Sequence, residues 1–289
     1  MKPQHISGIA RPLDFTYPGN LWIALSTGLT CAAVLLWNGV AGDGTGGSIG
    51  GDWISATGVA AQAGLAVFLA WAICRELEPD RAAAAVLASL LATGAIVLVG
   101  LPRTGACLVV LIAVRVLNRT TGVAATPLDM TVLLGLGVWA ALDAGWAYFA
   151  TAAAALLGDA LLSPRRLYRL ALVLASVAAA IGLLLLLGAP DVRLVGSSRL
   201  MAVAMALLLS LLLLPTIGAA TEVQSVGDIT GQPLNPVRVG AGQVLALGLG
   251  VLAALESGFA GLSALVPLWS AVAAAGLYRL LSRLTPMHW

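Results

Sequence analysis

Three carboxylates lie within five residues of a predicted loop, in the sequence C-R-E-L-E-P-D-R. They are Glu76, Glu78 and Asp80, and an arginine stands on each side of them. Carboxylate oxygens are the ligands that Mg²⁺ prefers, usually together with substrate phosphates. One interpretation is therefore a magnesium site for a diphosphate. The favoured interpretation is the solvated tip of a helical hairpin, because Pro79 cannot continue a helix.

The position of these carboxylates, between the second and third predicted helices, resembles that of the aspartate-rich motif of UbiA-type prenyltransferases. That family has N-D-x-x-D-x-x-x-D in this loop and a second aspartate-rich loop later, and neither is present here. We therefore assign no family. No cofactor is predicted, with Mg²⁺ at the three carboxylates as the one alternative.

A second polar segment reads V-R-V-L-N-R-T-T-G-V-A-A-T-P-L-D-M. Arg115 lies inside an apolar run, from which its long side chain can reach the lipid headgroups, and Asn118 and Arg119 follow. Arginine and hydroxyl groups at a membrane surface suit a phosphate or a lipid headgroup, and an ordinary loop is the alternative. The T-P-L-D that follows is a helix start, with Thr126 as the N-cap.

The longest polar loop runs from Thr221 to Arg238 and brings further amides and charges. If one face of the membrane carries chemistry, this loop and the two segments above are where the groups would converge; an ordinary connection is again the alternative. Its candidate residues are Glu222, Asp228, Asn235 and Arg238.

Ionisable residues inside membrane helices are functional candidates by default. Asp143, Asp159 and Glu256 all fall near predicted helix ends rather than at the midplane, which argues against a relay of buried carboxylates. Asp159 is expected to pair with Arg165 or Arg166, a turn or two further along the chain.

Other metal or nucleotide motifs are weak. Gly42 to Gly47 fits G-x-G-x-x-G, but a predicted membrane helix precedes it where a strand is required. Asp43 and Asp52 could hold Ca²⁺, although a flexible connection is favoured. The two histidines lie at opposite chain ends, and the three cysteines are scattered among apolar residues.

These candidate residues belong to a chain that is too apolar to be a water-soluble globular protein. Of 289 residues, 60% are hydrophobic and only 10% charged, against about 45–50% and about 25% in soluble domains. This excludes a soluble enzyme, a disordered chain and a nucleic-acid binder. The sequence predicts an all-α polytopic bundle of about ten helices, with apolar runs at 20–38, 54–74, 82–99, 104–117, 130–142, 145–162, 170–188, 199–218, 240–255 and 259–280.

The distribution of basic residues supports ten crossings. With a cytoplasmic N-terminus, every lysine and arginine except Arg103, Arg193 and Arg199 falls on the cytoplasmic side, as the positive-inside bias requires. Both termini are then cytoplasmic, with an arm at 1–19, one membrane domain at 20–281 and a tail at 282–289. The first helix is predicted to be retained; removal as a signal peptide ending at Ala41 is the alternative.

The arginine-rich, Ala- and Gly-rich composition indicates a bacterial protein of the inner membrane. The favoured function is a transporter or permease-like bundle for a small or lipidic solute, with helices unwound near Pro102, Pro215 or Pro267 around a cavity. The alternatives are a Mg-dependent enzyme acting on a phosphorylated lipid or prenyl donor, and an accessory subunit without a site. The predicted partner is the lipid bilayer; neither nucleic acid nor a soluble domain partner is indicated.

Overall fold

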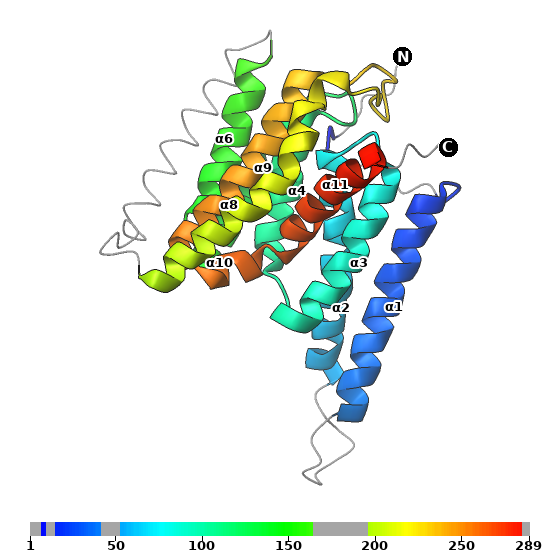
Figure 1. Cartoon of the computed structure of the whole chain (residues 1–289), viewed down its shortest axis with the longest axis vertical. Coiled ribbons are helices and arrows are strands. Elements are labelled where there is room, and N and C mark those ends of the chain that lie inside the picture. Colours follow the sequence, from blue (N-terminus) through cyan, green and yellow to red (C-terminus); the bar gives the residue numbers. More distant parts are fainter. Residues whose placement is uncertain (1–6, 10–14, 42–52, 164–195, 285–289) are drawn as a thin grey trace.

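The computed structural model describes residues 7–9, 15–41, 53–163 and 196–284. Within these ranges the chain is a bundle of α-helices joined by short loops (Figure 1), which confirms the predicted all-α class and the count of about ten. The helices are α1 (Pro18–Ala41), α2 (Trp53–Leu77), α3 (Ala82–Val99), α4 (Thr104–Asn118), α5 (Pro127–Ala144), α6 (Ala147–Leu161), α8 (Ser197–Gly218), α9 (Pro236–Ser257), α10 (Phe259–Ala264) and α11 (Val266–Leu284), with a 3₁₀ turn at Ala220–Glu222.

Six helices of the described part of the chain are long and apolar enough to cross a membrane. They are α1, α2, α3, α5, α8 and α9, and shorter apolar helices accompany them. The predicted run 130–142 begins earlier than expected, because Thr126 and Asp129 form a capping box that starts α5 at Pro127. The run 104–117 becomes the 15-residue helix α4. The apolar helices indicate a multi-pass membrane protein.

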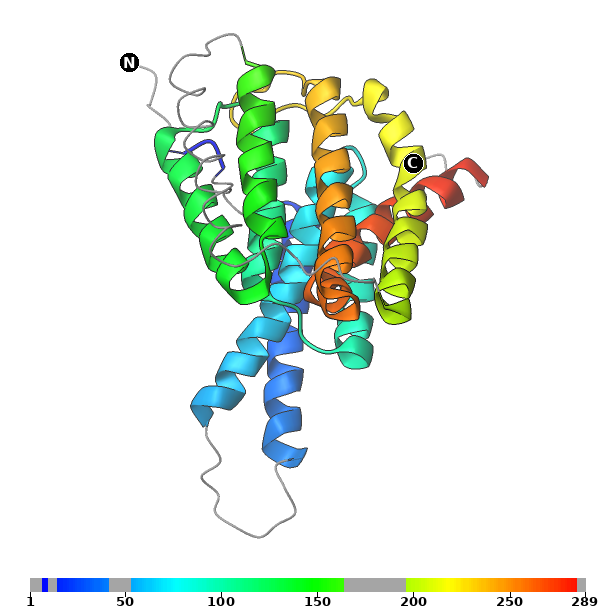
Figure 2. The same cartoon turned by 90° about the vertical axis from the view of Figure 1, so that its left-hand side faces the viewer.

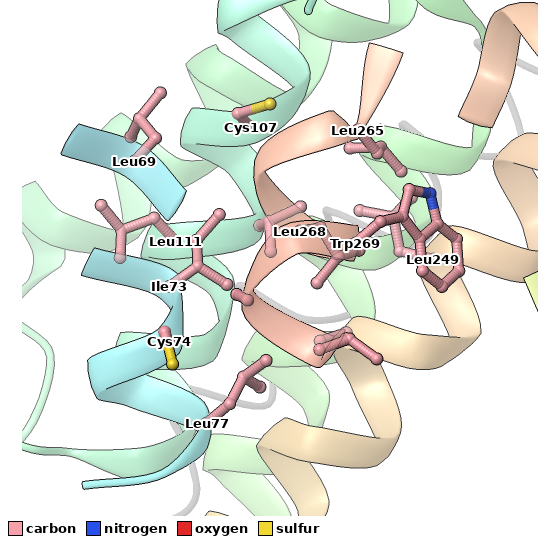
Figure 3. Close-up of a cluster of buried hydrophobic side chains, with 14 of the residues drawn as sticks. Leu69, Ile73, Cys74, Leu77, Cys107, Leu111, Leu249, Leu265, Leu268 and Trp269 are labelled. Atoms are coloured by element: carbon pink, nitrogen blue, oxygen red, sulfur yellow. The ribbon is translucent and has the colours of Figure 1, made fainter. Parts of the chain in front are cut away.

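The core of the bundle lies where α2, α4, α9 and α11 meet (Figure 3). Helix α1 lies at the edge and packs mainly against α2 and, to a smaller extent, α3 (Figures 1 and 2). The core side chains are mostly aliphatic, and the largest that are fully buried include Leu69, Ile73, Leu77, Leu249, Leu265 and Leu268.

The predicted last run, 259–280, is not one continuous helix. It breaks at Leu265 into α10 and α11, because Pro267 lacks an N–H and its ring clashes with the carbonyl four residues earlier. The start of α4 satisfies the Ala264 carbonyl that the break exposes: the Arg103 N–H donates to it at 3.2 Å and the Cys107 thiol at 3.4 Å. Trp269, two residues after Pro267, faces another helix near this irregularity.

Trp269 is the large side chain that joins α11 to α9. Its indole ring lies against Gly250, where a Cβ atom would come within 2.6 Å of the ring. Glycine at this position therefore sets how closely α11 can approach α9. The indole lies among Leu249, Leu265 and Leu268 (Figure 3).

Antiparallel helices give the bundle two chemically different ends. We call the end where α2, α4, α6, α8 and α11 finish the arginine-rich end, and the other the opposite end (Figure 1). Ser7, which contacts Asp129 at the start of α5, and Ser282, which contacts Arg81, both lie at the arginine-rich end. The first and last described segments thus lie on one side of the bundle, as an even number of crossings requires.

Several predicted features lie outside the described residues. These are the run 170–188, the carboxylates Asp43 and Asp52 with their glycine-rich loop, the arginines Arg165 and Arg166, and the two histidines.

Candidate functional site

The first two polar segments of the sequence meet at the arginine-rich end. Glu76, near the end of α2, accepts a hydrogen bond from Arg115 Nε of α4 at 2.7 Å. One turn on, the Asn118 amide donates to the Glu76 carbonyl at 2.8 Å. Glu76 and Asn118 are both buried. A charged pair and an amide therefore join the ends of α2 and α4.

Asp159 of α6 is the centre of a second buried cluster. Its Oδ1 atom lies 2.6 Å from Arg119 of the α4–α5 loop and 2.9 Å from Arg238 of α9. Arg238 also donates to the carbonyls of Leu117 at 3.0 Å and Leu162 at 2.8 Å. The cluster therefore links α4, α6 and α9 through two arginines from distant parts of the chain, whereas the predicted partners Arg165 and Arg166 lie outside the described residues.

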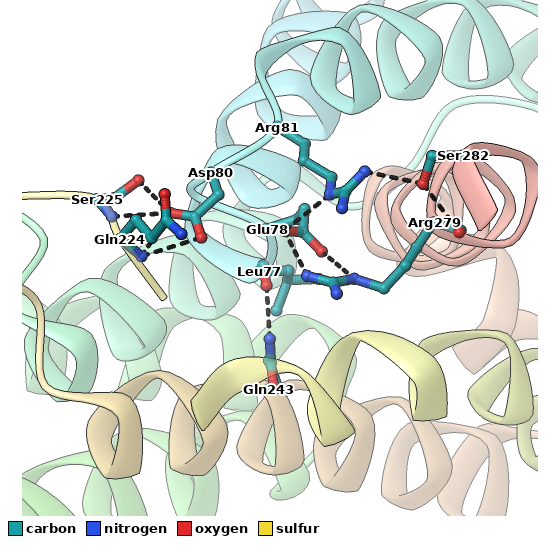
Figure 4. A network of polar contacts seen from close by, with 9 residues as sticks. All are labelled: Leu77, Glu78, Asp80, Arg81, Gln224, Ser225, Gln243, Arg279 and Ser282. Carbon is teal, nitrogen blue, oxygen red and sulfur yellow. Dashed lines mark hydrogen bonds and ion pairs between the residues drawn. The ribbon is translucent and has the colours of Figure 1, made fainter. Parts of the chain in front are cut away.

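Glu78 and Asp80 turn away from each other toward different partners (Figure 4). Glu78 is buried and accepts from Arg279 of α11 at 3.1 and 3.2 Å. Asp80 accepts from the backbone N–H groups of Gln224 at 3.1 Å and Ser225 at 2.8 Å, and from the Ser225 hydroxyl. The hairpin tip therefore clamps α11 on one side and the α8–α9 loop on the other.

The suggested magnesium site at Glu76, Glu78 and Asp80 has no support in this geometry, because each carboxylate faces a separate partner. Nor do the described ranges contain any group of three His, Cys, Asp or Glu side chains placed to hold a metal ion. The predicted solvated hairpin tip is wrong for Glu76 and Glu78, which are buried against arginines of other helices; of the three carboxylates only Asp80 is exposed.

The remaining predicted residues serve local structure. Asn235 caps α9, accepting from the Val237 N–H at 2.9 Å, and Glu222 is exposed in the 3₁₀ turn. At the opposite end, Asp143 forms an exposed pair with Arg103 at 2.8 Å. Glu256 accepts from the first N–H groups of α6, those of Trp146 at 2.9 Å and Ala147 at 3.3 Å.

Sequence reasoning missed three contributors to the arginine-rich end: Arg279, Gln243 and the N-terminal segment. Gln243 of α9 is buried and donates to the Leu77 carbonyl at 2.7 Å, so that it caps the end of α2 (Figure 4). Near the N-terminus, the Ser7 hydroxyl and the Gly8 N–H donate to Asp129 at 2.5 and 2.7 Å. For Arg279 and Gln243 the sequence did carry a signal, because an arginine or a glutamine inside an apolar helix needs a polar partner where it is buried.

A small polar pocket of about 300 Å³ lies between these loops. Its wall consists of Arg75 and Pro79 from the end of α2, Thr120 from the α4–α5 loop, and residues of the α8–α9 loop that include Ser225, Asp228 and Leu234. Among the predicted candidates, only Asp228 lines it.

A larger apolar cavity of about 710 Å³ lies toward the opposite end, between α3, α8, α10 and α11. The break between α10 and α11 forms part of its wall. Pro267 was the only residue in the sequence that pointed to this region. The apolar residues that line a cavity cannot be distinguished in the sequence from those of any other membrane helix. The lining includes Leu91, Ala95, Met205, Phe259, Ser263 and Ala273.

A comparison with protein-family models, curated proteins and solved structures found no match for this chain.

Proposed function

We propose that this protein is a transporter or permease-like bundle that carries a lipidic solute through the membrane. The observation that carries the proposal is the apolar cavity of about 710 Å³ built at the break between α10 and α11. Its volume lies in the range of about 300–1,000 Å³ that is typical of sites for small organic ligands.

The helix break supports a site rather than a packing defect. Non-helical backbone at membrane depth is tolerated only where protein buries it or where it lines a cavity. The break at Leu265 meets both conditions, because Leu265 is buried and its neighbours Ser263 and Val266 line the cavity. Broken helices form the substrate sites of many transporters. The wall is almost wholly apolar, with Ser263 and Ser270 as its hydroxyl groups, which favours an acyl or polyprenyl chain over a polar solute.

The charged groups at the arginine-rich end favour transport over the enzyme alternative. Glu76, Glu78 and Asp159 bind arginines of neighbouring helices, so these groups act first as clamps between helices. No second candidate function is favoured by a specific observation.

The test fills the cavity and measures lipid binding. Ala95 of α3 and Ala273 of α11 line it, and tryptophan at either position would occupy its volume. We expect a phospholipid with a diazirine on its acyl chain to photo-crosslink to cavity peptides in nanodiscs, and the crosslink to disappear in Ala95→Trp and Ala273→Trp. Lipid movement between leaflets of proteoliposomes should fall in the same variants.

Ala154→Trp is the matched control, because Ala154 is exposed on α6 and does not line the cavity. Equal crosslinking in the filled and control variants would refute the proposal. Crosslinking without lipid movement in the unmodified protein would favour the accessory alternative.

A further inference from the structure

We propose that the apolar cavity takes a lipid with an acidic headgroup, whose hydrocarbon chain fills the cavity while Arg199 of α8 binds the acid. The inference rests on the proposed function, because it names the class of lipid that the same cavity accepts. Arg199 does not line the cavity itself. It lies beside the rim, where the headgroup of a lipid with its chain in the cavity would stand.

The position of Arg199 follows from its contact with the junction of α9 and α10. A Cβ atom at Gly258, which joins these two helices, would lie 3.4 Å from Arg199 Cγ and 3.8 Å from Arg199 Cα. The next residue, Phe259, lines the cavity, as does Met205, six residues farther along α8. Six residues of α-helix rise about 9 Å. Arg199 is therefore next to the cavity, on the side of the opposite end (Figure 1).

Arg199 has no partner of its own. Its side chain is half-buried and makes no hydrogen bond or ion pair within the described part of the chain. Arg103, the other arginine described at this end, pairs with Asp143. The carboxylate of Glu256, two residues before Gly258, accepts from N–H groups of α6. The Arg199 guanidinium is thus open to an anion from outside the chain.

The cavity opens toward the hydrocarbon of the bilayer. Its exposed lining residues include Val99 at the end of α3, Met205 of α8 and Phe259 at the start of α10. Helices α3 and α8 are both long and apolar enough to cross a membrane, so their exposed faces meet lipid. From this rim the lining continues to Leu91, halfway along α3. A lipid of the leaflet at the opposite end has the same direction, with its headgroup at the helix ends and its chain toward the midplane.

A cation beside an apolar cavity selects an amphiphilic anion. A guanidinium donates two parallel N–H groups to a phosphate or a carboxylate, and such charged hydrogen bonds are stronger than neutral ones. Arg199 also lies in the first turn of α8, where the helix dipole favours negative charge. A zwitterionic headgroup brings an ammonium group that Arg199 repels. We therefore expect acidic lipids to be preferred over zwitterionic ones.

The test compares lipids that carry the same diazirine-labelled acyl chain and differ in the headgroup. Phosphatidic acid and phosphatidylcholine probes are added at equal mole fraction to the full chain in phosphatidylcholine nanodiscs, and crosslinked peptides of α3 and α11 are quantified by mass spectrometry. We expect about tenfold more crosslinking of phosphatidic acid, as for one hydrogen bond to a charged group. A labelled fatty acid separates the two acids: crosslinking equal to that of phosphatidic acid indicates any acidic headgroup, and weaker crosslinking indicates a phosphate.

Arg199→Gln removes the charge and keeps a polar side chain. We expect crosslinking of phosphatidic acid to fall to the level of phosphatidylcholine, whose own crosslinking should stay unchanged and so show that the cavity is intact. Arg199→Lys keeps the charge and should retain part of the preference. The matched control is Arg103→Gln, the same change at an arginine that is already paired with Asp143; it should leave the preference unchanged.

The outcomes separate this inference from the proposed function. Equal crosslinking of the phosphatidic acid and phosphatidylcholine probes in the unmodified protein, or a preference that survives Arg199→Gln, would overturn the inference and leave lipid binding in the cavity standing. Absence of cavity crosslinks with every probe would overturn both.

Discussion

The two ends of the bundle use their charged residues in opposite ways. At the arginine-rich end, buried carboxylates pair with arginines of other helices: Glu76 with Arg115, Glu78 with Arg279, and Asp159 with both Arg119 and Arg238. At the opposite end, Arg103 and Asp143 pair in the open, and Glu256 binds backbone N–H groups instead of an arginine.

This difference shows where the bundle is fixed and where it is hollow. Buried ion pairs hold helices in one register, because either charge is strongly disfavoured without its partner. The apolar cavity lies in the half that lacks such pairs, next to the broken helix. We therefore expect rearrangements linked to a lipidic ligand to occur toward the opposite end, while the arginine-rich end moves as one unit.

The largest expected effect is that of Asp159→Ala. This change leaves two arginines without their shared carboxylate, and one of them, Arg238, is only 5% exposed. Loss of one partner of a buried pair typically costs about 3–5 kcal/mol. Unfolding by SDS in mixed micelles should show this loss of stability. A loss below about 1 kcal/mol, the value for exposed pairs, would remove the distinction between the two ends.

A smaller effect is expected for the coupling between Glu78 and Arg279, which joins α2 to α11. A double-mutant cycle with Glu78→Ala and Arg279→Ala should give a coupling energy of about 0.5–3 kcal/mol. Both side chains are nearly buried, at 2% and 10% exposure. Coupling near zero in the same SDS titration would mean that this contact does not clamp α11.

Glu256→Ala tests the opposite end, where this carboxylate of α9 accepts hydrogen bonds from the N–H groups of Trp146 and Ala147 at the start of α6. We expect a loss of about 0.5–2 kcal/mol, as for other lost caps. Glu256→Gln keeps an acceptor oxygen and should lose less. A loss as large as that of Asp159→Ala would show that this end, too, depends on a buried charge.

The smallest effect is expected for Asp143→Ala. Its pair with Arg103 is exposed, at 54% and 46% for the two side chains, and such pairs contribute about 0–1 kcal/mol. Thermal unfolding at low and high salt measures it, since salt screens an exposed pair. A salt-independent loss above this range would contradict the comparison.

Much of the fold was predictable from the sequence, because long uninterrupted apolar runs indicate membrane helices. The break at Leu265 was only partly predictable: Pro267 indicated a kink, but a proline does not say whether a helix bends or ends. Pro215 shows the difference, since α8 continues through it. At Pro267 the helix ends instead, and the Ala264 carbonyl at the break accepts hydrogen bonds from α4 and the residue before it, from the Cys107 thiol and the Arg103 N–H.

The candidate residues were predictable as a group and not as pairs. The sequence correctly predicted that the loops around Glu76, Arg115 and Arg238 lie at one end of the bundle. The order of the helices decides on which side each loop falls, and so on which side its charges lie. The arginines predicted to pair with Asp159, Arg165 and Arg166, lie outside the described residues, whereas its partners Arg119 and Arg238 were not predicted from the sequence. Pairing depends on which faces of the helices meet, and an almost wholly apolar helix carries little pattern to indicate its inner face.

By itself, then, the sequence determined that the chain is a helical membrane bundle, where most helices begin and end, and that charges gather at one end. These properties follow from local composition and helix length, because the bilayer requires long apolar helices. Only the tertiary structure decided which arginine or backbone N–H group each carboxylate faces. It also decided where the bundle is hollow, because a cavity is the space that packed side chains leave between helices distant in sequence.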